Sequence, residues 1–164
     1  MTRSLVPNAL CSGPMTTFEK RTFIAAPPEA VFAFHERPDT LERLTPPWEN
    51  ARVVEKTGDG IKVGARVVIE LKLGPVKLRW TAEHVAYDPP RMFRDVQRGG
   101  PFRKWDHTHT VESAPGGATL VDTITYELPF APFSRVAAPF VRRKIERLFA
   151  FRHELTRQLC ESGS

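Results

Sequence analysis

The feature of this sequence that most restricts its fold is a run of strand-like segments that ends in one long helical segment. Between residues 52 and 128, six segments are rich in β-branched and aromatic side chains and are separated by short turns. Strands joined by short turns pair antiparallel. A further strand is predicted at 18–24, followed by short helices at 29–35 and 40–44. The predicted order is therefore strand, two short helices, six strands and one long helix.

The last segment, from Ser134 to about Cys160, repeats apolar residues at helical spacing. Pro139 lies inside it and predicts a separate or kinked first turn. An antiparallel sheet of this size must cover its apolar face, and only this helix is long enough to do so. The sequence therefore predicts an α+β fold in which a sheet wraps around the C-terminal helix, with room for a ligand between them.

Length and composition fit one globular domain, because 164 residues with 41% hydrophobic side chains are enough for a single core. We expect residues 1–16 to be a disordered leader and residues 17–161 to form the folded domain. No stretch reaches the roughly twenty apolar residues of a membrane span, and the leader lacks the apolar centre of a signal peptide. Cys11 and Cys160 belong to no metal or redox motif. A cytoplasmic protein without integral membrane association is therefore expected.

The formal net charge of +5 could attract an anionic partner. The basic residues are spread along the chain, apart from four that crowd the last helical segment: Arg142, Arg143, Lys144 and Arg147. No aromatic RNA-binding signature or zinc-finger spacing accompanies them, so no nucleic-acid partner is expected. We interpret the four residues as a solvated helix face, and a surface for a membrane or a partner protein is the alternative.

Several short motifs carry a resemblance to a known superfamily. The segment Ala-Ala-Pro-Pro-Glu-Ala-Val-Phe at 25–32 precedes a predicted helix, and other stretches are Phe34-His35, Leu44-Thr45-Pro46-Pro47-Trp48, Gly100-Pro101-Phe102, Trp105-x-His107-x-His109 and Asp122-x-Ile124-x-Tyr126-x-Leu128-Pro129. With the element order, they resemble the START-like (SRPBCC) superfamily over about residues 17–159, and a bacterial polyketide cyclase/dehydrase-like subgroup within it. The resemblance implies a helix-grip fold with a ligand cavity. It implies no substrate and transfers no catalytic residue.

Trp105, His107 and His109 lie on one face of a predicted strand, because alternate residues point to the same side. The next strand presents Asp122 and Tyr126 on one face. If the hairpin register joins these faces, a histidine oriented by a carboxylate could act as a general base. The candidate catalytic residues are therefore His107, His109, Asp122 and Tyr126. A buried hydrogen-bonded network and a solvent-facing polar surface are the two alternatives.

His107 and His109 supply only half of the ligands of a closed zinc site. A third ligand would have to come from His35, His84 or Asp122. This signal is weak, so we predict no metal and no cofactor. The sequence also has no glycine-rich phosphate loop, no GxSxG elbow and no cysteine spaced like a nucleophile from a histidine. Nucleotide chemistry and covalent catalysis are therefore not expected.

Aromatic residues recur along the predicted strands and could line an apolar pocket, although core packing explains most such rings. Trp48 is different, because it sits in a proline-rich loop where a large ring can gate a cavity mouth. Asp95 and Gln97 share a strand face with Phe93 and either contact a ligand or face water. The predicted ligand-binding residues are Trp48, Trp80, Phe93, Asp95, Gln97, Trp105, His107, His109, Tyr126 and Phe140.

The sequence leaves two main functions open. The favoured one is non-catalytic binding of an apolar or amphipathic small molecule in a cavity between the sheet and the C-terminal helix. The alternative is an enzyme of the polyketide cyclase/dehydratase type, a lyase that uses the histidine, aspartate and tyrosine group in that cavity. A homodimer or a protein partner also stays open. Binding is favoured because no complete catalytic constellation is visible and a fold does not specify chemistry.

Overall fold

One antiparallel sheet dominates the protein, whose computed structural model describes residues 15–129 and 133–163. Within these ranges the sheet has seven strands in the order β1-β7-β6-β5-β4-β3-β2. The strands are β1 (Thr16–Ile24), β2 (Ala51–Thr57), β3 (Arg66–Leu73), β4 (Val76–Asp88), β5 (Met92–Gly99), β6 (Lys104–Ala114) and β7 (Gly117–Glu127). The predicted antiparallel meander is confirmed, and β1 joins the sheet beside the last strand, β7. Most of the predicted leader, residues 1–14, lies outside the described residues.

The helices are α1 (Pro28–Glu36), α2 (Thr40–Arg43), the short 3-10 helix η1 (Pro47–Glu49) and α3 (Phe133–Glu161). Pro28 begins α1, where proline is tolerated because the first helical N–H needs no partner. Asp39 precedes α2, but its side chain makes no capping hydrogen bond and pairs with Arg37 and Arg43 instead. α3 continues through Pro139, so the first turn is not a separate helix.

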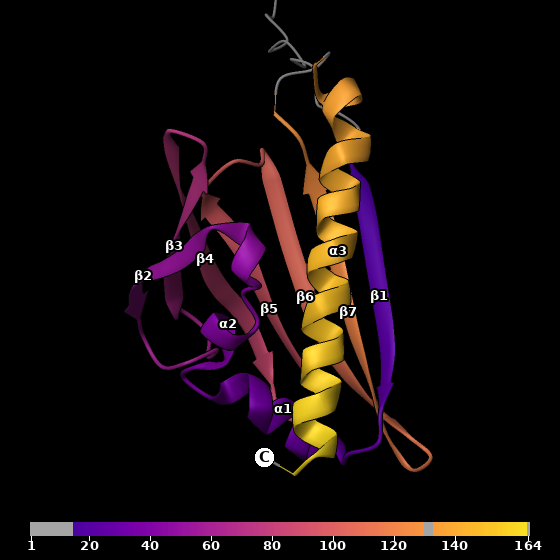
Figure 1. Cartoon of the computed structure of the whole chain (residues 1–164). Coiled ribbons are helices and arrows are strands. Elements are labelled where there is room, and N and C mark those ends of the chain that lie inside the picture. The colour runs from indigo at the N-terminus through magenta and orange to yellow at the C-terminus, as the bar shows by residue number, and fades with distance from the viewer. Residues whose placement is uncertain (1–14, 130–132, 164) are drawn as a thin grey trace, which may run out of the picture.

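α3 lies along β1, β7 and β6, and α1 sits beside its C-terminal half (Figure 1). Phe149 of α3 is fully buried, and its ring centroid lies 5.8 Å from that of Phe18 on β1 and 5.1 Å from that of His107 on β6. The residue pairs His107–Asp95 and His107–Ile124 are in register across β5, β6 and β7. Because paired residues of antiparallel strands share a face, all of them lie on the side that α3 covers, here called the inner face.

Two apolar clusters fill the space under the helices. The first joins α1 to the sheet and contains Ile24, Val31, Phe32, Phe93, Val111 and Leu120. The second joins α3 to the sheet and contains Phe18, Trp105, Ile124, Tyr126, Ile145 and Phe149. Polar side chains of β5, β6 and β7 lie between them, because His109 stacks on Phe93 of the first cluster while His107 contacts Phe149 of the second.

The four clustered basic residues of α3 are exposed, as expected of a solvated helix face: Arg142, Arg143, Lys144 and Arg147. Arg142 pairs with Glu146, Lys144 lies 3.4 Å from Glu49, and the Arg147 guanidinium lies 4.4 Å from the centre of the Trp48 ring. Across 15–129 and 133–163, no helix is both long and apolar enough to cross a membrane.

Candidate functional site

A buried group of histidines and aspartates occupies the middle of the inner face. Asp95 on β5 stands opposite His107 on β6, and His109 on β6 stands opposite Asp122 on β7. Asp95, His107 and Asp122 are less than 10% exposed, and the side chain of His109 is 13% exposed. The structure thus brings together three of the four predicted catalytic residues and adds Asp95, which sequence reasoning placed in a different set.

Asp122 is the acceptor that the histidines share. Its Oδ1 atom lies 3.2 Å from His107 Nε2 and 2.6 Å from His109 Nδ1. The contact with His109 is close but lacks the direction of a hydrogen bond, so this buried nitrogen has no hydrogen-bonding partner among the described residues. Oδ2 lies 2.8 Å from His153 Nε2 on α3, and His153 Nδ1 lies 2.8 Å from the Thr22 hydroxyl on β1. One carboxylate therefore connects β1, β6, β7 and α3.

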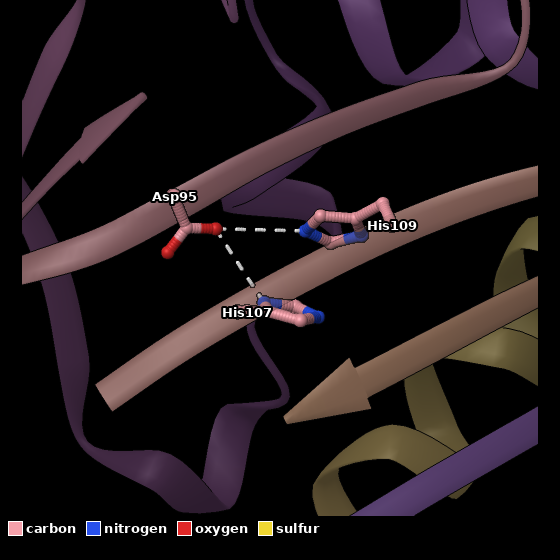
Figure 2. Close-up of side chains that lie close together, drawn as sticks. All are labelled: Asp95, His107 and His109. Carbon is pink, nitrogen blue, oxygen red and sulfur yellow. Dashed lines mark ion pairs between the residues drawn. The ribbon is translucent and has the colours of Figure 1, made fainter. Parts of the chain in front are cut away.

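Asp95 contacts the same two imidazoles from the other side. Its Oδ1 atom lies 3.5 Å from His107 Nδ1 and 3.6 Å from His109 Nε2. Figure 2 shows both rings turned so that one nitrogen of each points toward this carboxylate. The imidazole centroids are only 3.8 Å apart. Each of the two histidines therefore lies between two buried carboxylates.

The carboxylates control the charge of His107. Burial disfavours its imidazolium, but hydrogen bonds and charge from Asp122 and Asp95 outweigh this effect and raise the pKa of His107 to about 9. Burial also opposes ionisation of both carboxyls, yet the neighbouring histidines keep the pKa of Asp95 and Asp122 well below the usual range. At neutral pH and without a bound cation, His107 is therefore protonated and cannot accept a proton as a general base.

His35 on α1 lies next to this group in a different state. Burial is the largest cause that lowers the pKa of His35 to about 4, and the charge on His109 acts in the same direction. His35 Nδ1 is 2.8 Å from the Val31 carbonyl oxygen, which requires that this nitrogen donate a proton. His35 is therefore a neutral, hydrogen-bonded core histidine.

Two polar atoms on β4 face the same interior without a partner. Among buried side-chain atoms of the described residues, Trp80 Nε1 and His84 Nδ1 make no hydrogen bond. His84 is in register with Asp95, and burial is the main cause that lowers its pKa. A buried donor or acceptor without a partner marks a position where a water molecule or a ligand atom would bind.

The predicted aromatic residues form a group beside the histidines. The Trp80 and Trp105 ring centroids are 4.8 Å apart, and Phe102 lies 5.5 Å from Trp80 and 5.7 Å from Tyr126. Tyr126 is 1% exposed, and burial raises its pKa. The phenol predicted as catalytic thus belongs to this aromatic group. The side-chain amide of Gln97 is hydrogen-bonded to the backbone N–H and C=O of Phe102.

Trp48 and Phe140 lie at the periphery of the site. Trp48 is 40% exposed and packs edge-on against Phe151 of α3, with ring centroids 5.2 Å apart. Phe140 is 69% exposed on the outer surface of α3. The prediction that Phe140 lines a buried pocket is therefore not met, because the packed stripe of α3 runs through Val141, Ile145 and Phe149.

Sequence reasoning missed His153 and Thr22, which complete the hydrogen bonds around Asp122. His153 follows Ile145 by eight residues and Phe149 by four, and residues at this spacing share one face of a helix. This periodicity could have placed His153 on the buried face of α3. Nothing in the sequence around Thr22 distinguishes it from the other threonines of the strands.

A cleft of about 300 Å³ lies between the α2–η1 segment and β2. It is lined by Glu42, Thr45, Pro46, Pro47, Asn50, Ala51, Arg52 and Val53. Val53 is in register with Ile69, which is in register with Trp80. Val53, one of the residues that line the cleft, therefore lies on the same face of the sheet as Trp80.

A seven-stranded antiparallel sheet packed against one long C-terminal helix, with two short helices after the first strand, defines the helix-grip class of START-like proteins. Residues 24–151 match the family described as polyketide cyclase/dehydrase and lipid transport, and the chain belongs to this family. No curated protein matches the chain significantly by sequence.

Solved structures agree with this assignment of the fold. Protein TTHA0849 from Thermus thermophilus is 22% identical, with a TM-score of 0.69 over 92% of this chain and 99% of that one. The Zhui aromatase/cyclase from Streptomyces sp. R1128 is 17% identical, with a TM-score of 0.71 over 90% and 94%. The di-domain aromatase/cyclase StfQ of steffimycin biosynthesis is 14% identical, with a TM-score of 0.73 over 90% of this chain and 51% of that one. Likeness at this level of identity establishes the fold alone.

Proposed function

We propose that this protein binds an apolar or amphipathic small molecule on the inner face, between the sheet and α3. The observation that carries the proposal is the buried Trp80 Nε1 atom, which has no hydrogen-bonding partner among the described residues. Leaving such a donor unsatisfied costs about 1–3 kcal/mol, which a ligand acceptor group would recover. The ligand is therefore expected to carry one carbonyl or similar acceptor on a largely apolar framework.

The surroundings of Trp80 support this ligand class. Its ring packs against Trp105 and Phe102, which supply apolar walls. His84 Nδ1 offers a second unpaired polar atom on the same strand face. Apolar walls with a few polar atoms are typical of small-molecule sites.

The segment before β2 is suited to border the mouth of such a site. Arg152 Nε of α3 donates to the Leu44 carbonyl oxygen at 3.1 Å, and Trp48 packs on Phe151 of α3. Pro46 and Pro47, which lie between these two anchors, line the 300 Å³ cleft. We propose that a ligand enters through this cleft, with Trp48 at its border.

The test compares two conservative variants with the wild type. Trp80→Phe keeps an aromatic ring but removes the unpaired N–H, whereas Trp105→Phe removes an indole of the same group. We expect Trp80→Phe to weaken binding of anilinonaphthalene sulfonate, an apolar probe with acceptor oxygens, by about 2- to 10-fold, the value of one hydrogen bond. Trp105→Phe should change affinity less. Equal affinity of Trp80→Phe and the wild type would contradict the role of this nitrogen.

Native mass spectrometry of the purified protein, followed by organic extraction, tests the function itself. A stoichiometric apolar compound would identify the ligand class. A protein that carries no compound and binds no apolar probe would refute the binding proposal.

A cyclase or dehydratase is the second candidate, favoured by the unpaired His109 Nδ1 atom 2.6 Å from Asp122. In such a reaction the His109 imidazole would remove a proton from the carbon next to a carbonyl group, and the resulting imidazolium would return that proton to the hydroxyl that leaves as water, so that a carbon–carbon double bond forms. This candidate predicts that a polyketide-like thioester is converted to a cyclised product, and that His109→Gln abolishes conversion while the circular dichroism spectrum stays unchanged. Conversion at the wild-type rate in the variant would exclude His109 as the base.

A further inference from the structure

Asp95, His107 and His109 offer three metal-ligand atoms that lie within 4.8 Å of one another. The distances from Asp95 Oδ1 to the two imidazole nitrogens, 3.5 and 3.6 Å, are longer than a typical hydrogen bond of about 2.7–3.2 Å. They match the edges of a tetrahedron around zinc, because metal–ligand bonds of about 2.0–2.2 Å give edges of about 3.3–3.6 Å. Octahedral coordination with the same bonds would give edges of about 2.8–3.1 Å.

The nitrogens on the other side of both rings face Asp122. His107 Nε2 is hydrogen-bonded to Asp122 Oδ1, and His109 Nδ1 lies 2.6 Å from the same oxygen. A carboxylate behind a metal-binding histidine fixes its tautomer, because the N–H points to the carboxylate and the other nitrogen keeps its lone pair for the metal. Here Asp122 does this for His107 through a hydrogen bond, and it lies close to His109 Nδ1 without one. His153, which also contacts the Thr22 hydroxyl, holds that carboxylate in place.

The charge and the rigidity of the surroundings also suit a bound cation. Asp95 and Asp122 bring two buried carboxylates to either side of the rings. His109 lies flat on Phe93, with centroids 4.0 Å apart and an interplanar angle of 13°, which fixes the plane of its ring. Two imidazoles and one carboxylate, oriented by an outer carboxylate, form a ligand set that suits a divalent transition metal.

We propose that Asp95, His107 and His109 form a three-residue Zn²⁺ site that leaves one coordination position open to water or to a ligand oxygen. The inference departs from the sequence-based expectation of no metal, because that expectation did not consider Asp95 as the third ligand. It does not depend on the identity of the apolar molecule, since it rests on the three side chains and on Asp122 behind them.

The first test uses the full chain without a polyhistidine tag, treated with EDTA and then dialysed. We expect calorimetric titration with ZnCl₂ to give one ion per chain. Titration with Co²⁺ should give the strong visible absorption of tetrahedral cobalt, and Zn²⁺ should shift the imidazole ¹⁵N resonances of two histidines. A folded protein that takes up no Zn²⁺, or a cobalt spectrum of the weak octahedral type, would overturn the proposal without any mutation.

The second test assigns the ligands. Asp95→Asn and His109→Gln should weaken Zn²⁺ binding by at least about 100-fold, since the loss of an outer partner alone costs about 10- to 100-fold. Asp122→Asn should fall in that smaller range and keep one ion per chain, which is the behaviour of a positioning residue. The matched control is His35→Gln, which changes a buried imidazole outside the set and should keep affinity within about threefold.

Thermal melts of each variant separate loss of ligands from loss of structure. Wild-type affinity in a folded Asp95→Asn protein would refute the assignment. If the variants do not fold, the cobalt spectrum and the ¹⁵N shifts of the wild type decide the question.

Discussion

Replacing Phe149 by Ala should destabilise the protein strongly, whereas the same replacement of Phe140 on the same helix should not. Phe149 is fully buried, contacts Phe18 and His107, and has the Arg152 guanidinium 5.2 Å from its ring centre. Truncating a buried Phe costs about 3–5 kcal/mol through lost transfer energy and the cavity left behind. The ring contacts place the expected loss near the middle of that range, at about 4 kcal/mol.

Phe140 is 69% exposed and belongs to neither apolar cluster, so its truncation should change the free energy of unfolding by no more than about 0.5 kcal/mol. Urea unfolding followed by far-ultraviolet circular dichroism measures both values. In thermal melts, the Phe149→Ala variant should unfold about 8–16 °C lower than the wild type. Equal losses in the two variants would mean that α3 does not present this face to the sheet, and the whole description of the inner face would fail with it.

Three further predictions concern individual polar groups. Asp122→Asn should destabilise the metal-free protein by about 3–5 kcal/mol in urea unfolding, because it removes the charge that the buried imidazoles share; a loss below about 1 kcal/mol would contradict this. Thr22→Val should cost about 1–2 kcal/mol, since the variant leaves His153 Nδ1 buried without its partner, and no change would mean that the contact is not a hydrogen bond. Burial raises the pKa of the Cys160 thiol to about 11, so that the reactive thiolate form appears only at high pH. At pH 8 iodoacetamide should therefore modify Cys160 at least about tenfold more slowly in the folded chain than in urea, as measured by peptide mass spectrometry, and equal rates would refute the effect of burial.

Much of the fold was predictable because each element is specified by local patterns. The short turns between residues 52 and 128 required antiparallel neighbours, and the apolar spacing after Ser134 required a long helix. The ends of the elements were less certain. β1 begins at Thr16 rather than at Phe18, because pairing with Tyr126 on β7 extends it, and a local pattern does not contain its partner strand.

The site was predictable only in part, because it depends on register and on the rotation of α3. His107, His109 and Asp122 were expected to meet if the β6–β7 hairpin had the right register, and it has. Asp95 joins them through pairing between β5 and β6, and β5 itself is joined to β4 through two irregularities that no turn motif indicates. The prediction for Phe140 failed because the side of a helix that faces the sheet is set by packing. The packed side of α3 carries Ile145 and Phe149, and Phe140 lies outside it.

The position of the polar cluster is itself an argument for function. Asp95, His107 and Asp122 are buried between two apolar clusters that already pack the helices onto the sheet. Buried charged groups contribute little net stability, and apolar residues of similar volume often stabilise a protein as well or better. The fold alone therefore gives no reason for two carboxylates and two imidazoles at this place. The proposed cation, with an open coordination position on the same sheet face as Trp80, would give one, because it would bind to the Asp95 carboxylate and to both imidazoles.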